Sequence, residues 1–588
     1  MSSFDDRSTF SLVWQILERK DKWRLSFALV LILIGTVLEM ASLGLVIPVV
    51  QAVVEGDQRS SYSRLPSVLE EISYSAFVQI LMVLLVIVFV VKNLFLLCSN
   101  YFQQRLQLSI SNRVFHRLFE LYLRQPYEFH LAHSSSLLVR NVQEYSTAIV
   151  GNGVTPILTI STDAVTGLGL LIILLLVEPL ATGALLVLFA FSSYFLLALS
   201  RSKTRRWGAE RVIHRGRILE AVMNGFGGVK EIKVFGRDEE ILGAHRDSLY
   251  QAARSSYLFA VAQGVPRAIF EVTAVFAVSL LVINATLRTS DLQSAALIVA
   301  LYGVVAFRML PSVNRVIQSA QLLSFGRAGI EGAVSGLSLS SAKPLLSGKT
   351  SREAFRICKV QGLKFRYPNT ETFVTDIDKL EICAGEALGI IGASGSGKST
   401  LVDLLIGVLT PTEGSISIND RGIHEDPRFW QDQIGFVPQY VYLMDTTIRR
   451  NIAFGLPDSA VNEMEVERVL RLANLWDFVQ TLPAGLETVV GERGVRLSGG
   501  QRQRLGIARA LYGNPQVIVL DEATSALDEA TEREIVESMR EISRDRTLIV
   551  VAHRVSTLAH CSRLIRLDTG RVVQDGSYDA VIERANIE

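Results

Sequence analysis

The stretch Gly392–Thr400, GASGSGKST, decides the fold of the C-terminal half of this chain. It fits G-x-x-x-x-G-K-[ST], the loop whose backbone N–H groups cradle phosphates. The short apolar run Leu388–Ile391 leads into it, as a buried strand that feeds a glycine loop would. These residues predict a nucleotide-binding loop between a strand and a helix. Because such a match also arises by chance, the prediction needs a second signal.

The second signal is the pentapeptide Leu497–Gln501, LSGGQ, together with two apolar runs later in the chain. The continuously apolar run Val517–Leu520 predicts a parallel strand buried on both faces, and it ends at the acidic pair Asp521–Glu522. A further run of this kind, Leu548–Val551, ends two residues before His553. The spacing argues against an ordinary surface location for the acidic pair and predicts a phosphate-handling site.

The N-terminal half is built for lipid. Only 20% of the 588 residues are charged, and the mean hydropathy is +0.31. Six apolar stretches each supply the ~20 residues that a helix needs to cross hydrocarbon. Buried helices of a large soluble domain are the alternative, which six such lengths in series disfavour. The stretches are Trp23–Val54, Ala76–Cys98, Ala148–Val177, Leu180–Leu199, Tyr257–Ile283 and Leu292–Leu310.

The predicted fold class is therefore multi-domain: an all-α transmembrane domain of six helices followed by an α/β P-loop domain. We place the transmembrane domain in residues 1–331 and the P-loop domain in residues 354–588. Residues 332–353 are rich in Ser and Gly, lack apolar periodicity and are interpreted as a linker. The net charge of +1 gives no reason to expect nucleic acid as a partner. The four scattered cysteines suggest neither a zinc site nor a disulfide framework.

Basic residues predict the orientation in the membrane. Residues 201–217 carry seven Lys and Arg, whereas residues 55–75 carry two Arg and four acids. An excess of Lys and Arg marks the cytoplasmic side. Both termini and the P-loop domain are therefore expected in the cytoplasm, with the chain passing several times through a cell inner (plasma) membrane. Two cytoplasmic connections break at Gln125–Tyr127 and Asn224–Gly228, where a short transverse helix or a simple hairpin turn is expected.

Taken together, these motifs and spans resemble the ABC exporters that consist of six spans and one ATPase domain. The resemblance covers nearly the whole chain and implies an ATP hydrolase coupled to transport, with ATP and Mg²⁺ as cofactors. One copy of each motif implies a half-transporter that works as a homodimer. Each ATP would then lie between Lys398 of one chain and Ser498, Gly499 and Gly500 of the other.

The resemblance, together with the chemistry of the side chains, implies a role for each motif residue. Glu522 would polarise the attacking water as general base, His553 would contact the γ-phosphate, and Gln439 would link the nucleotide to the membrane domain. Ser399, Gln439 and Asp521 would hold Mg²⁺, and Tyr367 would stack on adenine. The remaining nucleotide-binding candidates are Gly392, Ser394, Gly395, Gly397, Lys398, Ser399, Thr400, Ser498, Gly499, Gly500, Gln501 and Asp528.

The cargo is predicted by weaker signals. Leu38–Val50 and Gly228–Asp238 resemble stretches of PglK-like flippases of lipid-linked oligosaccharides and of polysaccharide-locus transporters, and Ser63–Ile72 resembles their short external helix. Arg308 and Arg315 share one face of the sixth span, where they either line a basic cavity for a pyrophosphate head group or anchor at the membrane interface.

Arg267 is a third candidate for binding the substrate, although it stands one helical turn from Glu271. We therefore expect membrane lipid and a lipid-linked anionic substrate as partners. Export of drugs, peptides or simple lipids is the alternative, and an ATP-gated channel or regulator is the alternative of another class.

Overall fold

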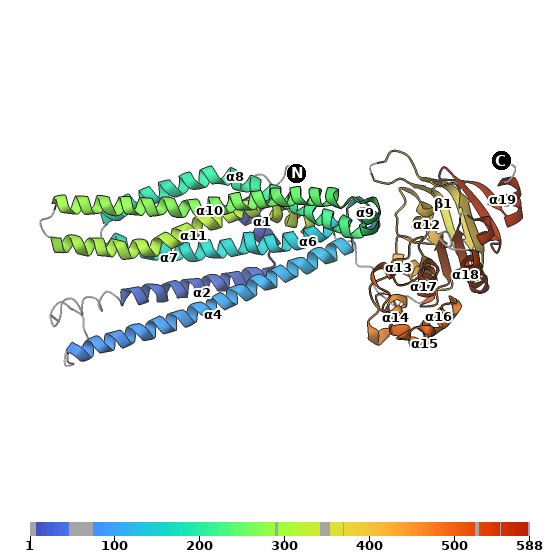
Figure 1. Cartoon of the computed structure of the whole chain (residues 1–588), viewed down its shortest axis with the longest axis horizontal. Coiled ribbons are helices and arrows are strands. Elements are labelled where there is room, and N and C mark those ends of the chain that lie inside the picture. Colours follow the sequence, from blue (N-terminus) through green and yellow to red (C-terminus); the bar gives the residue numbers. More distant parts are fainter. Residues whose placement is uncertain are drawn as a thin grey trace. The chain divides into compact units, whose positions relative to one another are not determined.

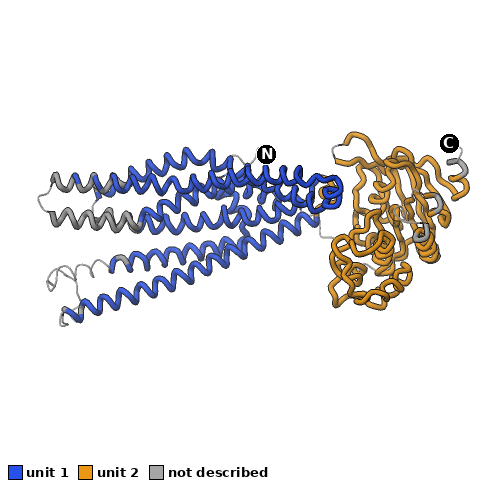
Figure 2. Tube along the Cα trace, in the orientation of Figure 1, with its two compact units in different colours: residues 1–124, 133–341 blue, residues 125–132, 342–588 orange. Residues whose placement is uncertain are grey.

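The computed structural model describes residues 8–45, 74–177, 179–288, 292–340, 353–368, 370–523, 529–552 and 554–585, which form two compact units (Figures 1 and 2). Unit 1 comprises Met1–Arg124 and His133–Ser341, and unit 2 comprises Gln125–Ala132 and Ala342–Glu588. The short segment Gln125–Ala132 thus belongs with the C-terminal unit, although unit 1 flanks it in sequence.

Unit 1 is all helical in the part that the structure describes. Four of the six predicted spans lie within one helix each there, and the first does so as far as Gly44, with residues 46–54 outside the described residues. The third, Ala148–Val177, begins at the end of one helix and runs through a π-helical turn into the next. A π-helical turn, η3, joins α6 to α7. The elements are α1 (Thr9–Ile16), α2 (Arg19–Gly44), α4 (Tyr74–Leu123), α6 (Ser135–Ile149), η3 (Val150–Val154), α7 (Thr155–Val177), α8 (Pro179–Gly227), α9 (Val229–Phe235), α10 (Asp238–Arg288) and α11 (Leu292–Leu337).

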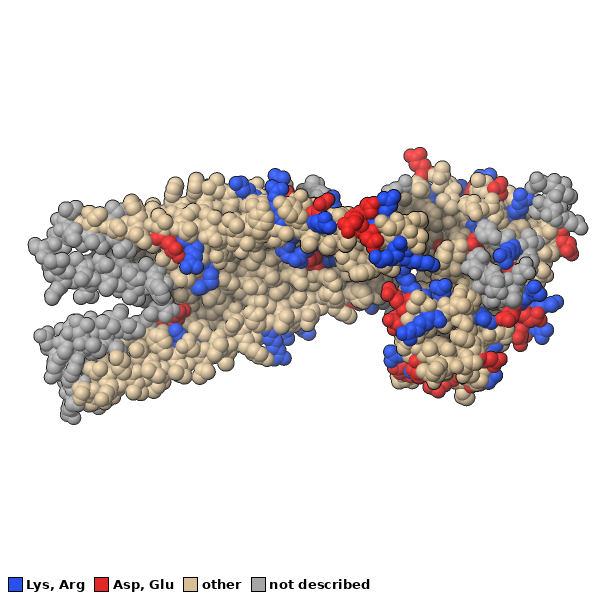
Figure 3. Space-filling model, in the orientation of Figure 1, with Lys and Arg blue, Asp and Glu red and all other residues tan. Residues whose placement is uncertain are grey.

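The long helices expose apolar side chains, as helices surrounded by lipid do. Val86 of α4, Val187 of α8 and Val272 of α10 each leave more than half of their surface uncovered. Figure 3 shows this face: charged side chains are dense over unit 2 and sparse along the long helices. Among the described residues, four helices are long and apolar enough to cross a membrane, in α2, α4, α8 and α10.

Both predicted breaks lie between helices. α4 ends at Leu123, and α5 (Tyr127–Ala132) begins directly after Pro126, which cannot donate a backbone hydrogen bond. α8 ends at Gly227, and α9 stops at Gly236, whose φ of +62° is left-handed. A short helix, rather than a simple hairpin turn, therefore follows each break.

The end of α11 differs from the sequence-based interpretation. The helix continues to Leu337, so the first residues of the predicted linker 332–353 are helical. The reason is close packing: a Cβ on Gly332 would lie 2.4 Å from the ring of Tyr145, and a Cβ on Gly326 would lie 2.1 Å from Cβ of Asn152. Glycines that suggest a flexible linker in the sequence here let α11 approach α6 and η3.

A proline interrupts α10 beside α11. Pro266 has no N–H to donate to the carbonyl of Ala262, four residues earlier. Two glutamine side chains of α11 reach this backbone: Gln321 Nε2 lies 3.5 Å from the Ala262 oxygen, and Gln318 Nε2 donates to the Gln263 oxygen at 3.0 Å. Neighbouring helices commonly satisfy carbonyls that proline frees within a membrane.

Unit 2 is an α/β domain with two sheets. The six-stranded sheet has the order β10-β9-β3-β8-β7-β6, and its strands are parallel except for β10. All five residues of β7 and of β8 are buried, as predicted for strands covered on both faces. The second sheet is antiparallel, with the order β2-β1-β4-β5.

The elements of unit 2 place the nucleotide motifs at strand ends. Its strands are β1 (Ile357–Phe365), β2 (Thr375–Cys383), β3 (Ala387–Gly392), β4 (Glu413–Ile418), β5 (Arg421–Gly422), β6 (Ile434–Val437), β7 (Val517–Asp521), β8 (Thr547–Val551), β9 (Arg563–Asp568) and β10 (Arg571–Gly576). After α5, its α-helices are α12 (Lys398–Leu405), α13 (Pro427–Gln431), α14 (Ile448–Ile452), α15 (Glu463–Leu472), α16 (Trp476–Thr481), α17 (Gly499–Leu511), α18 (Glu529–Ile542) and α19 (Tyr578–Ala585).

Candidate functional site: an ATP site and a cavity among the long helices

The phosphate loop connects β3 to α12. Gly395 and Gly397 have φ of +81° and +96°, a left-handed conformation that side chains disfavour. A Cβ on Gly397 would also lie 2.7 Å from the carbonyl oxygen of Val374. Glycine at this position therefore lets the loop close tightly, and Ser399 and Thr400 enter the first turn of α12. Such a loop at a helix N-terminus suits a phosphate.

Lys398 lies inside the loop. Its ammonium donates to the carbonyl oxygens of Gly392 and Ala393, each at 3.0 Å. Burial lowers the pKa of Lys398, while the charges of Glu522 and Asp521 act in the opposite direction. The two carboxylates thus lie close enough to the loop to act on its charge, as the motif spacing predicts.

The acidic pair lies at the end of β7, where Asp521 is the last residue of the strand and Glu522 is the next residue. Glu522 has φ of +49°, which is uncommon outside glycine, and its N–H donates to the Val551 oxygen at 2.9 Å. Such strain of about 1–3 kcal/mol persists where the surroundings hold it, often at functional sites. Gln439 Nε2 donates to the Glu522 carboxylate at 2.6 Å. The structure therefore brings together two residues that are 83 positions apart.

A magnesium ion fits the oxygen donors near the loop. Ser399 offers a hydroxyl, Asp521 a carboxylate and Gln439 an amide oxygen, and Mg²⁺ prefers such hard donors. The charge of Asp521 acts on Lys398 of the loop and also on Asp403 of α12. Asp521 therefore lies beside the helix that carries Ser399, so both residues are near the position that a cation bound to phosphate would take.

Tyr367 follows β1 and lies beside the loop. Its hydroxyl is 3.1 Å from that of Thr400, so the ring is tied to the first turn of α12. The ring of Phe365 packs against it edge to face, with centroids 5.1 Å apart. Tyr367 is half-buried, which leaves part of the ring for a base to stack on.

The LSGGQ residues form an exposed helix N-terminus. Ser498 caps α17: its hydroxyl accepts the Gln501 N–H at 3.2 Å, while the Gln501 side chain accepts the Ser498 N–H at 2.9 Å. This reciprocal capping box fixes the turn that contains Gly499 and Gly500. The free N–H groups of such a turn favour an anion. Ser498 and Gly499 are exposed, so this helix end is accessible to a second molecule.

Three predicted residues have side chains outside the described part of the chain. His553 and Asp528 are wholly outside the described residues. The backbone of Arg308 belongs to α11, but its side chain is outside the described part of the chain. Next to His553, Arg554 pairs with Glu532 of α18, whose carboxylate also accepts the Thr557 hydroxyl at 2.8 Å. No motif pointed to Glu532, because its partners lie more than twenty residues further along the chain.

The segment α5 contacts the ATP domain within unit 2. The Glu128 carboxylate accepts the N–H of Thr410, just beyond α12, at 3.0 Å. Burial raises the pKa of Tyr127, and the charges of Asp403 and Tyr367 add to the effect. The helix α5 therefore lies close to the C-terminal end of α12, the helix that follows the nucleotide loop.

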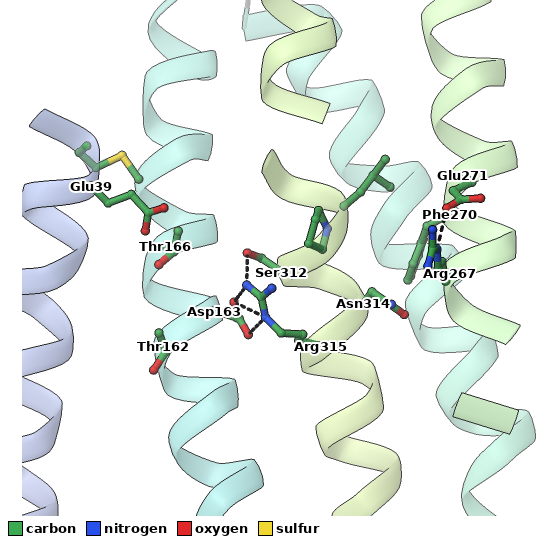
Figure 4. A pocket seen from close by; sticks show the side chains of 13 residues that line it. Glu39, Thr162, Asp163, Thr166, Arg267, Phe270, Glu271, Ser312, Asn314 and Arg315 are labelled. Carbon is green, nitrogen blue, oxygen red and sulfur yellow. Dashed lines mark hydrogen bonds and ion pairs between the residues drawn. The ribbon is translucent and has the colours of Figure 1, made fainter. Parts of the chain in front are cut away.

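A second candidate site is a cavity of about 660 Å³ within unit 1, lined by α2, α7, α10 and α11 (Figure 4). In Figure 4 Arg315 points from α11 to Asp163 of α7, and the Glu39 side chain points from α2 toward the same region. Arg315 Nε donates to the two Asp163 oxygens at 2.9 and 3.2 Å, and Arg315 Nη2 lies 3.2 Å from Ser312 Oγ. Arg267 Nε donates to Glu271 at 2.8 Å.

This geometry differs from the basic cavity that the sequence led us to expect. Both described arginines of the lining are paired with carboxylates, Arg315 across two helices and Arg267 within α10. The pairing of Arg315 with Asp163 joins residues 152 positions apart, which no local pattern signals. The described charges of the cavity are therefore mixed in sign rather than basic.

These features define a class of protein. The model of the family described as ABC transporter transmembrane region matches residues 25–307, and the ABC transporter model matches residues 376–525. The chain belongs to the ABC transporters, as a half-transporter in which a membrane-spanning helical domain is fused to an ATPase domain. It binds ATP and couples ATP hydrolysis to transport across a membrane.

Individual relatives point to exporters. An ATP-dependent lipid A-core flippase of Chromobacterium violaceum is 27% identical over 508 residues, which is 85% of each chain. The leukotoxin translocation ATP-binding protein LktB of Mannheimia haemolytica is 39% identical over 292 residues, 48% of this chain and 40% of LktB. A solved bacterial Atm1-family ABC exporter with ATP bound has the same fold, with a TM-score of 0.78, 22% identity and 96% of each chain covered.

Proposed function

We propose that this ABC exporter is a flippase that moves a lipid-linked, glycosylated substrate with a phosphate-bearing head group across the inner membrane. The observation that carries the proposal is the cavity among apolar helices, whose lining includes Arg267 and Arg315. Charged residues at membrane depth are costly and mark substrate paths. The flippase relative is similar over 85% of both chains, whereas the toxin-associated relative is similar over half of this chain.

The chemistry on the ATP side follows from the motif residues. Lys398 would exchange its two loop carbonyls for β- and γ-phosphate oxygens, and Glu522 would orient and deprotonate the attacking water. Gln439 holds the Glu522 carboxylate and would sense its state. A bound Mg²⁺, held by Ser399, Asp521 and Gln439, would neutralise charge that develops on the phosphates. Asp528 and His553 would complete the site as the family pattern implies.

We further propose a homodimer in which each ATP lies between the phosphate loop of one chain and Ser498–Gln501 of the other. The exposed N-terminus of α17 supports this, because it offers anion-binding groups to a second molecule. The α9 region supports it too. Phe226, Val234 and Phe235 are each more than 70% exposed, an apolar surface that a partner subunit would cover.

The orientation proposed from the basic connections places both termini and the ATPase domain in the cytoplasm. The contact of α5 with unit 2 supports this, because α5 lies in the first basic connection. We propose that α5 couples the two domains, since it contacts the segment after α12, the helix that begins at Lys398.

The test is a transport assay with the full-length protein in proteoliposomes, supplied with phosphate-bearing lipid-linked glycans, simple phospholipids or peptides. The proposal expects faster ATP-dependent flipping of the lipid-linked glycans than of the simple phospholipids, and no transport of peptides. Glu522→Gln serves as the control without hydrolysis. Transport of peptides with no response to any lipid would refute the proposed cargo, and the protein would still be an exporter.

A further inference from the structure

The cavity of unit 1 contains no surplus of positive charge. Its described lining has the guanidinium groups of Arg267 and Arg315 and the carboxylates of Glu39, Asp163 and Glu271, a formal sum of 2 − 3 = −1. A head group with only negative charge would therefore meet a described lining whose net charge repels it.

The two guanidinium groups nevertheless keep donors for a phosphate. Arg315 uses Nε and Nη2 for Asp163 and Ser312, and its Nη1 makes no hydrogen bond to any residue that the structure describes. Arg267 donates to Glu271 through Nε, and within the described part of the chain neither of its Nη atoms donates. The Arg267 side chain is 73% exposed and that of Arg315 is 52% exposed. Both can therefore reach a phosphate without leaving their carboxylates.

Resting on the proposed function, we propose that this cavity recognises a lipid head group that carries a phosphate and an ammonium group together. The phosphate takes the Nη donors of Arg267 and Arg315. The ammonium lies among the carboxylates of Glu39, Asp163 and Glu271. Such a head group leaves the charge of the cavity unchanged and desolvates no unpaired charge.

Each simpler head group meets only half of this lining. An anionic head group satisfies the two arginines but lies beside three carboxylates. Two of these carboxylates already pair with the arginines. A cationic head group satisfies the carboxylates and is repelled by the guanidinium groups. Selectivity comes from these unfavourable encounters as much as from the favourable ones. The cavity of about 660 Å³ lies in the usual size range for ligand sites.

The experiment uses the full-length protein in detergent and three probes with the same fluorescent acyl chains. Their head groups are phosphoethanolamine (zwitterionic), phosphoglycerol (anionic) and trimethylammonium-propane (cationic). Binding is titrated for each probe, and stimulation of ATP hydrolysis is measured in parallel. We expect the phosphoethanolamine probe to bind at least about tenfold more tightly than either of the others.

Two variants assign the two charges. Glu39→Gln should weaken the zwitterionic probe and strengthen the anionic one, while Arg267→Gln should weaken both phosphate-bearing probes. Glu239→Gln, at an exposed carboxylate of α10 that does not line the cavity, should leave all affinities unchanged. If a variant fails to fold, the order of the three probes on the unmodified protein still decides.

The outcomes separate this inference from the proposed function. If the anionic probe binds as tightly as the zwitterionic probe, charge balance is overturned and the lipid flippase proposal stands. If none of the three probes binds while ATP hydrolysis is intact, the flippase proposal fails together with the inference. If Glu39→Gln changes neither affinity, the assignment of the ammonium to this side of the cavity is wrong.

Discussion

Replacing Arg315 by methionine should destabilise the membrane domain far more than the same change at Arg267. Methionine keeps most of the aliphatic stem, so the change removes the charge rather than the packing. Replacing Arg315 removes the cation that pairs with Asp163, whose side chain is only 4% exposed. Replacing Arg267 removes the cation that pairs with Glu271, whose side chain is 57% exposed and can be hydrated. The pair of variants therefore compares a buried ionic contact with an exposed one on neighbouring helices.

The magnitude follows from the burial of the carboxylates. Breaking a buried pair costs about 3–5 kcal/mol, because one charge remains uncompensated. Since Arg315 itself is half exposed, we expect about 2–3 kcal/mol for Arg315→Met. Because Arg267 and Glu271 are both exposed, solvent screens their attraction, and Arg267→Met should cost far less stability. Asp163→Asn should restore much of the loss in the Arg315→Met background, because no buried charge then remains.

The assay is thermal unfolding of the full-length protein in detergent, followed by tryptophan fluorescence, with all four proteins at one concentration. Arg315→Met should lower the apparent melting temperature by roughly 5 °C, and Arg267→Met by less than about 2 °C. Equal losses in the two single variants would refute the reasoning, as would a double variant no more stable than Arg315→Met.

Three further predictions concern other parts of the chain. Glu522→Gln should lower steady-state ATP hydrolysis by at least ~100-fold and retain bound ATP in a dimer, measured by phosphate release and size-exclusion chromatography; wild-type turnover would contradict the general-base assignment. Burial raises the pKa of Asp403 to about 6, so the folded protein binds a proton there that the unfolded chain has lost, and stability falls as pH rises from about 4 to above 6. Asp403→Asn should therefore resist urea better at pH 7.5 and show no gain near pH 4, and a gain independent of pH would exclude titration as the cause. Gly332→Ala should lower the free energy of unfolding by about 1–3 kcal/mol because its Cβ meets Tyr145, whereas Gly243→Ala, in open space on α10, should raise it slightly; melting temperatures report both changes, and equal effects would show that the close packing is unimportant.

The sequence was sufficient for the fold and for the motif positions, because their physical causes are local. A continuously apolar run predicts a buried strand wherever it occurs, so β3, β7 and β8 were found with their ends correct to about one residue. Apolar length predicts membrane helices in the same way. Proline and glycine mark the breaks before α5 and α9, because they act on their own backbone.

Contacts between distant residues could not be predicted in this way. The partner of Arg315 is on α7, and the sequence offered several acids at similar depth in the membrane. In the sequence, Gly332 and Gly336 suggested a linker. Their packing between helices can be recognised only from the opposing side chains of Tyr145 and Tyr122, which are distant in sequence. The contact of Gln439 with Glu522 depends likewise on the order of strands β6 and β7, which the motifs alone do not specify.

The glutamine contacts at Pro266 restrict how the membrane domain can move. If α11 slid along α10, Gln318 and Gln321 would leave the carbonyl oxygens of Gln263 and Ala262, so both contacts would be lost. The two helices should therefore travel as a single rod during a transport cycle. Arg267 and Arg315, one on each helix, would then keep a constant spacing, and α7, which Arg315 holds through Asp163, would move with them, so that the cavity opens by displacement of α2.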